Sequence, residues 1–276
     1  MKFGTLVRLK DLSQVKEQFD ALKKEGLEVC QLVYKPEKYI KEDAEIIANA
    51  SKSAGIEICG FFAGYRDNNC FWDGYHDYNV AGINNLTFGK ERIEYVKSAI
   101  EFASLIGIKQ VIIHAGYVTN NPFSQEFTLM VSLLKKLCAF AKGFGVDILL
   151  ETGQESPIAL KRLIVMSGAD NLFINFDTAN VIMYGYGNPV DAIYTFGEYI
   201  RNTHAKDGLP PKEIDKTGVE TVIGEGYVDF ERVLKDLKKT GYDDYIVVER
   251  EISGEQQKVD VLKAIEKLKT IWNSLD

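Results

Sequence analysis

The chain has 276 residues, of which 46% are hydrophobic and 26% are charged, a composition typical of an ordinary globular protein with a large core. Its formal net charge of -7, without a stripe of basic residues, argues against a nucleic-acid partner, because phosphate backbones are bound by clustered Lys and Arg. The length suits either two domains of ordinary size or one α/β barrel of about 250 residues, and no linker divides the sequence.

Cysteine spacing and hydropathy restrict the compartment and the class of protein. The cysteines lie far apart with no C-x-x-C pair, which predicts neither a zinc knuckle nor a disulfide framework: Cys30, Cys59, Cys70 and Cys138. The N-terminal apolar stretch is too short for a signal peptide, and no run of about 18 apolar residues occurs. We therefore expect a cytoplasmic protein with no membrane partner.

Short apolar runs alternate with amphipathic stretches along the whole chain, in the order strand, helix, strand, helix. Strands are predicted at 3–9, 27–34, 56–65, 109–116, 146–153, 171–180, 200–208 and 245–251. Amphipathic stretches such as 43–55, 91–107, 127–145 and 156–168 follow them, and the last helix is expected at 255–275. The pattern makes eight βα units.

Glycines mark the ends of the predicted helices, where a left-handed residue commonly terminates a helix: Gly26, Gly55, Gly107, Gly145, Gly168 and Gly241. Eight βα units in a chain of this length predict a (β/α)8 TIM barrel that forms a single domain over residues 1–276. A doubly wound open sheet is the structural alternative. It would predict a Gly-rich phosphate-binding turn after the first strand, which "VRLKDLSQ" does not provide.

Ionisable residues end five consecutive predicted strands: His114, Glu151, Asp177, His204 and Glu249. In TIM barrels the functional residues occupy the C-terminal ends of the strands, so these side chains are expected to meet at one rim. Each of them alone has an ordinary structural interpretation, as a helix N-cap, a loop hydrogen-bond acceptor or a surface charge.

The combination of three carboxylates and one imidazole favours a divalent metal ion. Carboxylates this close would repel one another unless a cation neutralised them. The ligand set formed by Glu151, Asp177, His204 and Glu249 suits one ion of Mn²⁺, Co²⁺, Mg²⁺ or Zn²⁺, with open positions for the oxygens of a sugar. We therefore interpret Asp177 as a metal ligand.

Five segments resemble, in this order, the xylose-isomerase-like barrel superfamily of sugar phosphate isomerases and epimerases: "LLETGQE", "NFDTAN", "NTHAKDG", "GEGYVDF" and "VVERE". The resemblance covers nearly the whole chain. It implies that the same four side chains bind one catalytic metal, commonly Mn²⁺ in that family. It also implies that Glu151 and Glu249 lie on opposite sides of the substrate and exchange a proton through an enediolate. The "GEG" turn at 224–226 matches the loop before the seventh helix in that family.

One residue departs from that family pattern. Many relatives have a His three residues after the metal-binding Asp, whereas this chain has Asn180. An amide can hydrogen-bond a hydroxyl or a carboxylate but cannot titrate near neutral pH, so we expect Asn180 to bind substrate without moving a proton.

Further substrate contacts are predicted around the metal ligands. His114 could hydrogen-bond a substrate oxygen or be a structural histidine, while Glu155 could orient a hydroxyl and Lys206 could stabilise an anionic oxygen. Lys212 and Lys216 permit a phosphate contact without requiring one. Arg250 should point away from the site, because successive strand residues face opposite sides.

The connection after the third strand is too long for a routine βα loop: "RDNNCFWDGYHDYNVAGINN". Its aromatic residues could form a lid over the apolar face of a sugar, with Trp72 and Phe71 as the candidates and His76 as a further site residue. Anchoring of a long loop explains the aromatic residues equally well.

The leading hypothesis is a metal-dependent isomerase or epimerase of a ketose or related carbonyl sugar. A lyase of the same superfamily is the alternative, of the inosose or dehydroshikimate dehydratase type or one that cleaves C-glycosides. The DNA-repair endonuclease branch needs a cluster of metal ions held largely by histidines, and this chain has three histidines and an acidic balance. A non-catalytic binding module should have lost part of the ligand set, and a homo-oligomer is compatible with the sequence.

Overall fold

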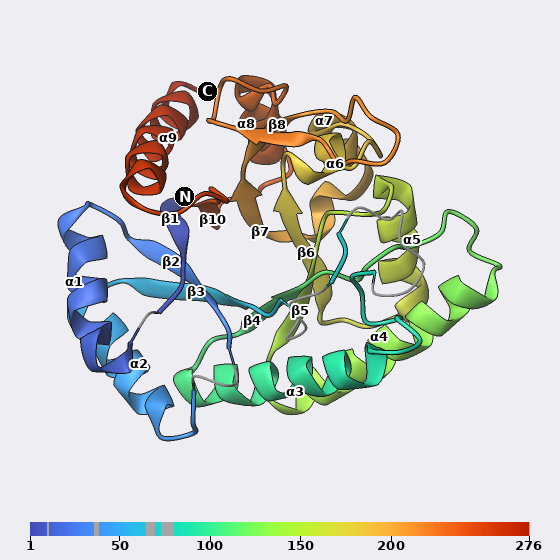
Figure 1. Cartoon of the computed structure of the whole chain (residues 1–276), viewed down its shortest axis with the longest axis horizontal. Helices are drawn as coiled ribbons and strands as arrows, with labels where there is room; N and C mark the ends of the chain where they lie inside the picture. The colour runs from blue at the N-terminus through green and yellow to red at the C-terminus, as the bar shows by residue number, and fades with distance from the viewer. Residues whose placement is uncertain (10, 36–38, 65–69, 73–79, 276) are drawn as a thin grey trace.

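The computed structural model describes residues 1–9, 11–35, 39–64, 70–72 and 80–275. Eight parallel strands close into a barrel in the order β1-β10-β7-β6-β5-β4-β3-β2, which confirms the predicted TIM barrel (Figure 1). The barrel strands are β1 (Lys2–Val7), β2 (Val29–Val33), β3 (Glu57–Phe62), β4 (Gln110–Ile113), β5 (Asp147–Glu151), β6 (Leu172–Asp177), β7 (Ile200–Ala205) and β10 (Tyr245–Val248).

Helices surround the strands as an outer layer (Figure 1). They are α1 (Val15–Lys24), α2 (Asp43–Ala54), α3 (Gly89–Ile106), α4 (Gln125–Gly143), α5 (Pro157–Ser167), α7 (Pro189–Phe196), α8 (Phe230–Lys239) and α9 (Glu255–Ser274), with short 3-10 turns η1 (Leu12–Gln14) and η2 (Gly197–Tyr199). Gly55 and Gly168 end α2 and α5 at φ of 67° and 62°, a conformation that L side chains rarely adopt. All six glycines predicted to end helices have positive φ, so the sequence located these boundaries correctly.

Two small elements were not predicted. The short helix α6 (Asn180–Met183) follows β6, and the segment after β7 forms an antiparallel hairpin of β8 (Asp207–Leu209) and β9 (Val219–Thr221) rather than an irregular loop. The buried Asp207 carboxylate fixes the loop that follows this hairpin, because it accepts the backbone N–H groups of Gly224, Gly226 and Val228 at 2.8 to 3.0 Å. A Cβ atom on Gly226 would lie 2.1 Å from Asp207 Oδ1, which explains the second glycine of the "GEG" turn.

The core has two parts. The larger one lies between the strands and the helices, where residues such as Phe19, Phe176 and Phe196 are fully buried. A separate cluster contains Val29, Cys59 and Val247, and strand alternation places it inside the barrel, because Val247 lies two residues before Glu249 on the same face. This apolar cluster thus lies below the charged rim.

No helix in the described ranges has both the length and the apolar character needed to cross a membrane. The four cysteines are free thiols, and the sequence predicted no disulfide framework for them.

Candidate metal centre and active site

The four predicted metal ligands converge at the C-terminal end of the barrel. Glu151 and Asp177 are the last residues of β5 and β6, His204 is the second-last residue of β7, and Glu249 follows β10 directly. One ligand atom from each side chain lies within 4.8 Å of the other three. Parallel strands deliver their ends to the same rim, so four segments far apart in sequence form one cluster.

His204 lies at the centre of this cluster. Its Nδ1 atom is 2.9 Å from Glu151 Oε1, 3.3 Å from Glu249 Oε2 and 4.0 Å from Asp177 Oδ2. Within the described residues, Glu151 Oε2 and Asp177 Oδ2 are buried and accept no well-aligned hydrogen bond, although His114 Nε2 and Lys206 Nζ lie 3.4 and 3.1 Å from them. Buried carboxylate oxygens are costly unless cations pair with them, and the three carboxyl groups around His204 form with it a donor set that fits a divalent ion.

The Asp177 carboxylate caps a helical turn with one oxygen and faces the cluster of candidate ligands with the other. Oδ1 accepts the backbone N–H groups of Ala179 and Asn180 at 2.8 and 2.7 Å, as a capping residue does at the start of a helical turn. Oδ2 faces the cluster instead. The capping bonds fix the carboxylate and thereby orient its second oxygen toward the site.

Lys206 brings a buried ammonium group into the same cluster. Its Nζ atom lies 3.1 Å from Asp177 Oδ2, 3.0 Å from Glu249 Oε2 and 2.8 Å from Glu251 Oε1. Burial lowers the pKa of Lys206, but the carboxylates of Asp177, Glu249 and Glu251 outweigh it and raise the pKa well above the ordinary value. The lysine therefore stays positively charged beside two of the candidate ligand oxygens.

Burial and neighbouring charges also shift the pKa values of His204 and Glu249 in opposite directions. Burial lowers the pKa of His204, but Glu151 and Glu249 raise it well above its ordinary value. Burial raises the pKa of Glu249, whereas Lys206 and His204 together hold it well below its usual range. Burial raises the pKa of Asp177 to about 7, although Lys206 opposes this effect. Without a metal, the cluster thus holds an ionised Glu249 against protonated His204 and Lys206. A metal ion would have to displace the proton from His204 Nδ1.

A cavity of about 420 Å³ opens onto the cluster. Six of its lining residues were predicted from sequence: Trp72, His114, Glu151, Asn180, Lys206 and Glu249. The sequence analysis did not assign the other six to the site: Arg8, Phe62, Met183, Tyr184, Thr217 and Glu251. Arg8 directly follows β1 and was detectable by its position at a strand end, whereas Thr217 comes from the unpredicted hairpin connection.

His114 and Trp72 form one wall of this cavity. His114 Nε2 is 3.4 Å from Glu151 Oε2, and the Trp72 ring packs edge-on against the imidazole at a centroid distance of 4.8 Å. Burial lowers the pKa of His114, and the Glu151 carboxylate opposes this effect only in part. A neutral imidazole at this position can hydrogen-bond a polar group in the cavity.

Asn180 and Glu155 differ in their access to the cavity. The Asn180 Nδ2 group donates to Thr152 O at 2.9 Å and lies 3.4 Å from Glu151 Oε1, so the amide borders a candidate ligand. Glu155 is buried and accepts the Gly153 N–H at 3.0 Å, and it does not line the cavity. Burial raises the pKa of Glu155 to about 8.

The remaining predicted residues either do not line the cavity or lie outside the part of the chain that the structure describes. Lys216 pairs with Glu213 at the surface, and neither Lys212 nor Lys216 lines the cavity. Arg250 pairs with Glu220 and Asp260, which confirms that it points away from the site. His76 and most of the predicted lid lie outside the described residues.

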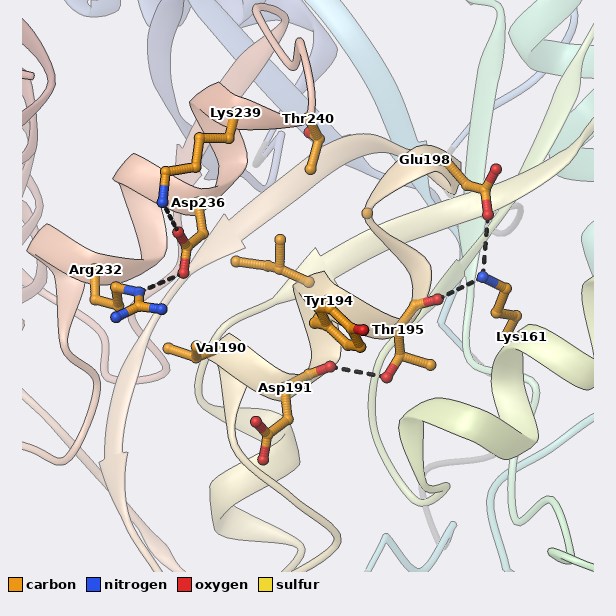
Figure 2. Close-up of a pocket in the computed structure, with 12 residues that line it drawn as sticks. Lys161, Val190, Asp191, Tyr194, Thr195, Glu198, Arg232, Asp236, Lys239 and Thr240 are labelled. Atoms are coloured by element: carbon orange, nitrogen blue, oxygen red, sulfur yellow. Dashed lines mark hydrogen bonds and ion pairs between the residues drawn. The ribbon is translucent and has the colours of Figure 1, made fainter. Parts of the chain in front are cut away.

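A larger cavity of about 690 Å³ lies on the outside of the barrel, between α5, α7 and α8 (Figure 2). Five of the six charged residues that line it in the described ranges pair with one another: Lys161 binds Glu198 and the Thr195 carbonyl, and Asp236 binds Arg232 and Lys239. Size alone would favour this cavity. The satisfied charges and exposed side chains leave the smaller cavity as the candidate site.

The model of the xylose isomerase-like TIM barrel family matches residues 19–271. The chain belongs to this family. A structure described as a xylose isomerase domain protein from Planctomyces limnophilus aligns with a TM-score of 0.88 at 28% identity, covering 99% of this chain and 98% of that one.

Two curated relatives match over shorter regions. The inosose dehydratase of Lacticaseibacillus casei is 26% identical over 143 residues, which are 46% of this chain and 47% of the dehydratase. The fructoselysine 3-epimerase of Shigella flexneri is 25% identical over 171 residues, which are 58% of this chain and 59% of the epimerase. The chain thus spans about half the length of these relatives. The prediction of the xylose-isomerase-like barrel family is confirmed.

Proposed function

We propose that the chain is a divalent-metal-dependent isomerase or epimerase of a ketose or related carbonyl sugar. The observation that carries the proposal is the position of Glu151 and Glu249. Both carboxylates line the same cavity, come from separate strands and contact His204 Nδ1 at 2.9 and 3.3 Å. Two carboxylates beside one metal centre are what a proton exchange at a carbon atom requires.

The metal would be held by Glu151, Asp177, His204 and Glu249. When bound, it would polarise the substrate carbonyl and a neighbouring hydroxyl, which makes the C–H bond beside the carbonyl more acidic. Mn²⁺ is the ion we expect, with Co²⁺, Mg²⁺ or Zn²⁺ as alternatives that suit the same oxygen and nitrogen ligands.

The residues around the metal have distinct proposed roles. One of Glu151 and Glu249 removes the proton beside the carbonyl, and the other returns a proton to the carbon skeleton. The neutral His114 and the Asn180 amide hydrogen-bond substrate oxygens. The Lys206 ammonium stabilises the negatively charged oxygen that develops when the proton leaves. Trp72 packs on the apolar face of the sugar, and the cavity of about 420 Å³ accommodates a small carbohydrate.

A lyase is the second candidate, and the buried Lys206 favours it specifically. The same proton removal followed by cleavage of a C–O bond at the next carbon would release hydroxide, which takes up a proton and leaves as water. Lys206 Nζ lies 3.0 Å from Glu249 Oε2, so a fixed positive charge lies beside a candidate base and can stabilise the departing hydroxide. The similarity to an inosose dehydratase agrees with this alternative.

Incubation with a panel of carbonyl sugars in D₂O separates the two reactions. An isomerase or epimerase should place deuterium on the carbon beside the carbonyl, detected by NMR, unless the carboxylate shields the proton from solvent. A lyase should give an unsaturated product and water. Absence of both outcomes across substrates and metals would contradict the proposed function. A cytoplasmic location, a carbohydrate as the only partner and a homo-oligomeric state remain predictions.

A further inference from the structure

Gln31 is a fully buried amide on β2, which lies directly across the closed barrel from β6, the strand that ends in Asp177. Its Oε1 atom lies 2.7 Å from Nε2 of His204, and its Nε2 group donates to Asn175 Oδ1 at 3.2 Å. Three polar side chains inside the barrel thus form a chain from Asn175 through Gln31 to His204. The sequence predicted this strand from its apolar residues and gave no role to the glutamine.

The hydrogen bonds among Asn175, Gln31 and His204 determine which ring nitrogen of His204 carries a proton. Because the NH₂ group of Gln31 is engaged by Asn175, the glutamine presents its carbonyl oxygen to His204. A carbonyl oxygen can only accept, so the proton resides on His204 Nε2. In the metal-free cluster Nδ1 also carries a proton, which faces Glu151 and Glu249 at 2.9 and 3.3 Å. When a metal ion displaces that proton, the one remaining N–H stays on Nε2, and the lone pair of Nδ1 faces the ion.

We infer that Gln31 is a positioning residue for the candidate metal centre, which fixes the His204 tautomer and ring orientation so that Nδ1 faces the ion. The inference rests on the metal site of the proposed function, but not on the reaction that the site performs. Metal-binding histidines commonly donate their second N–H to an oxygen acceptor, and loss of that acceptor weakens metal binding. Here the acceptor comes from a strand that contributes no ligand.

The first test compares metal binding by three variants of the full chain. Gln31→Met has a similar volume but no acceptor, so the Kd for Mn²⁺ or Zn²⁺ should rise about 10- to 100-fold, measured by competition with a chromophoric chelator. Gln31→Glu keeps an oxygen acceptor, and the Asn175 amide can turn to donate to it, so binding should recover toward that of the wild type.

The control is Gln110→Met, which removes another interior glutamine. Gln110 accepts from Asn202 Nδ2 at 2.8 Å and makes no contact with the four ligands, so its loss should change stability without changing metal affinity. If Gln31→Met does not fold, Gln31→Asn serves instead, because an amide one methylene shorter withdraws the acceptor from Nε2. Equal metal affinity in the wild type and a folded Gln31 variant would overturn the inference.

A second readout does not depend on affinity. In the Zn²⁺-loaded protein, ¹⁵N NMR of the His204 ring should show a proton on Nε2 and none on Nδ1, with His76 and His114 distinguished by substitution of each. The Nε2 proton should exchange faster in Gln31→Met and be protected again in Gln31→Glu. A proton on Nδ1 in the loaded protein would contradict the inference. If the wild type binds no divalent ion, the proposed function itself fails, and the two failures are thereby distinguished.

Discussion

The cavity at the strand ends and the outer cavity between α5, α7 and α8 contain similar charges in different surroundings. In the described part of the chain, each cavity is lined by three acidic residues, namely Glu151, Glu249 and Glu251 at the strand ends, and Asp191, Glu198 and Asp236 on the outer surface (Figure 2). The Glu151 and Lys206 side chains are 1% and 2% exposed, whereas Glu198 and Arg232 are 65% and 57% exposed. Exposed charges are screened by water, so burial strengthens the charge interactions in the smaller cavity, which is the candidate site.

The two cavities also differ in how their acidic groups pair with basic groups. In the outer cavity the acid–base contacts join helix side chains that could rearrange at small cost. At the strand ends, three carboxyl groups share the Lys206 ammonium, and Asp177 and Glu151 are held by β-strands. A site that binds an ion needs such fixed groups with more acidic than basic partners. We therefore expect substitutions in the strand-end cavity to change function strongly, and substitutions in the outer cavity to change only stability, by a small amount.

The largest effect is expected for Glu249→Gln. Glutamine keeps an oxygen that can coordinate the metal weakly but cannot accept a proton, so turnover should fall by a factor on the order of 10² or more while part of the metal binding remains. Steady-state kinetics and metal analysis on the same samples measure the two quantities. If activity falls only in proportion to metal occupancy and excess metal restores it, Glu249 serves the ion alone, and Glu151 and His114 become the candidate bases.

Metal removal should also abolish activity. Purified protein should carry or take up about one divalent ion per chain, because the four ligand atoms define one site. Treatment with EDTA should remove the ion and activity together, and Mn²⁺ should restore both. His204→Ala should weaken binding, since it deletes the only imidazole of the ligand set. Elemental analysis that finds no ion, before or after metal addition, would contradict the proposed centre.

The Lys206→Met variant tests whether a buried lysine affects metal binding and turnover more than an exposed lysine does. The ammonium lies 3.1 and 3.0 Å from oxygens of Asp177 and Glu249, so its removal should tighten Mn²⁺ binding and lower turnover through loss of charge stabilisation. Lys161→Met, in the outer cavity, is the matched control and should change neither quantity. A variant with weaker metal binding would show that the lysine holds the carboxylates in place rather than competing for them.

The sequence predicted the architecture well because its signals are local. Alternating apolar runs and terminal glycines such as Gly55 and Gly168 determine strands and helix ends through short-range physics. The four candidate ligands were identified from their positions at strand ends, and the structure places them close together. The Gln31 acceptor and Thr217 were missed because each acts through a contact between distant segments. One interior glutamine in an apolar strand is a weak signal until its partner across the barrel is known.

Glu155→Gln tests a smaller effect, on stability. Burial raises the pKa of Glu155 to about 8 from an ordinary value of 4.5, so between these pH values the folded protein binds more protons than the unfolded chain. This contribution to the free energy of unfolding therefore falls as pH rises from 4.5 to 8. In metal-free protein, Glu155→Gln should flatten that decline, measured by denaturant unfolding at several pH values. Parallel pH profiles for wild type and variant would contradict a buried, protonated Glu155.

The smallest effect is expected for Asp236→Asn in the outer cavity. The Asp236 carboxylate pairs with Arg232 and Lys239, but both partners are exposed, and an exposed ion pair contributes about 0.2–1 kcal/mol. The variant should lose stability within that range, and the loss should shrink at high salt because ions screen the pairs. Metal affinity and turnover should equal those of the wild type. A clear fall in turnover would assign a functional role to the outer cavity and remove the distinction drawn between the two.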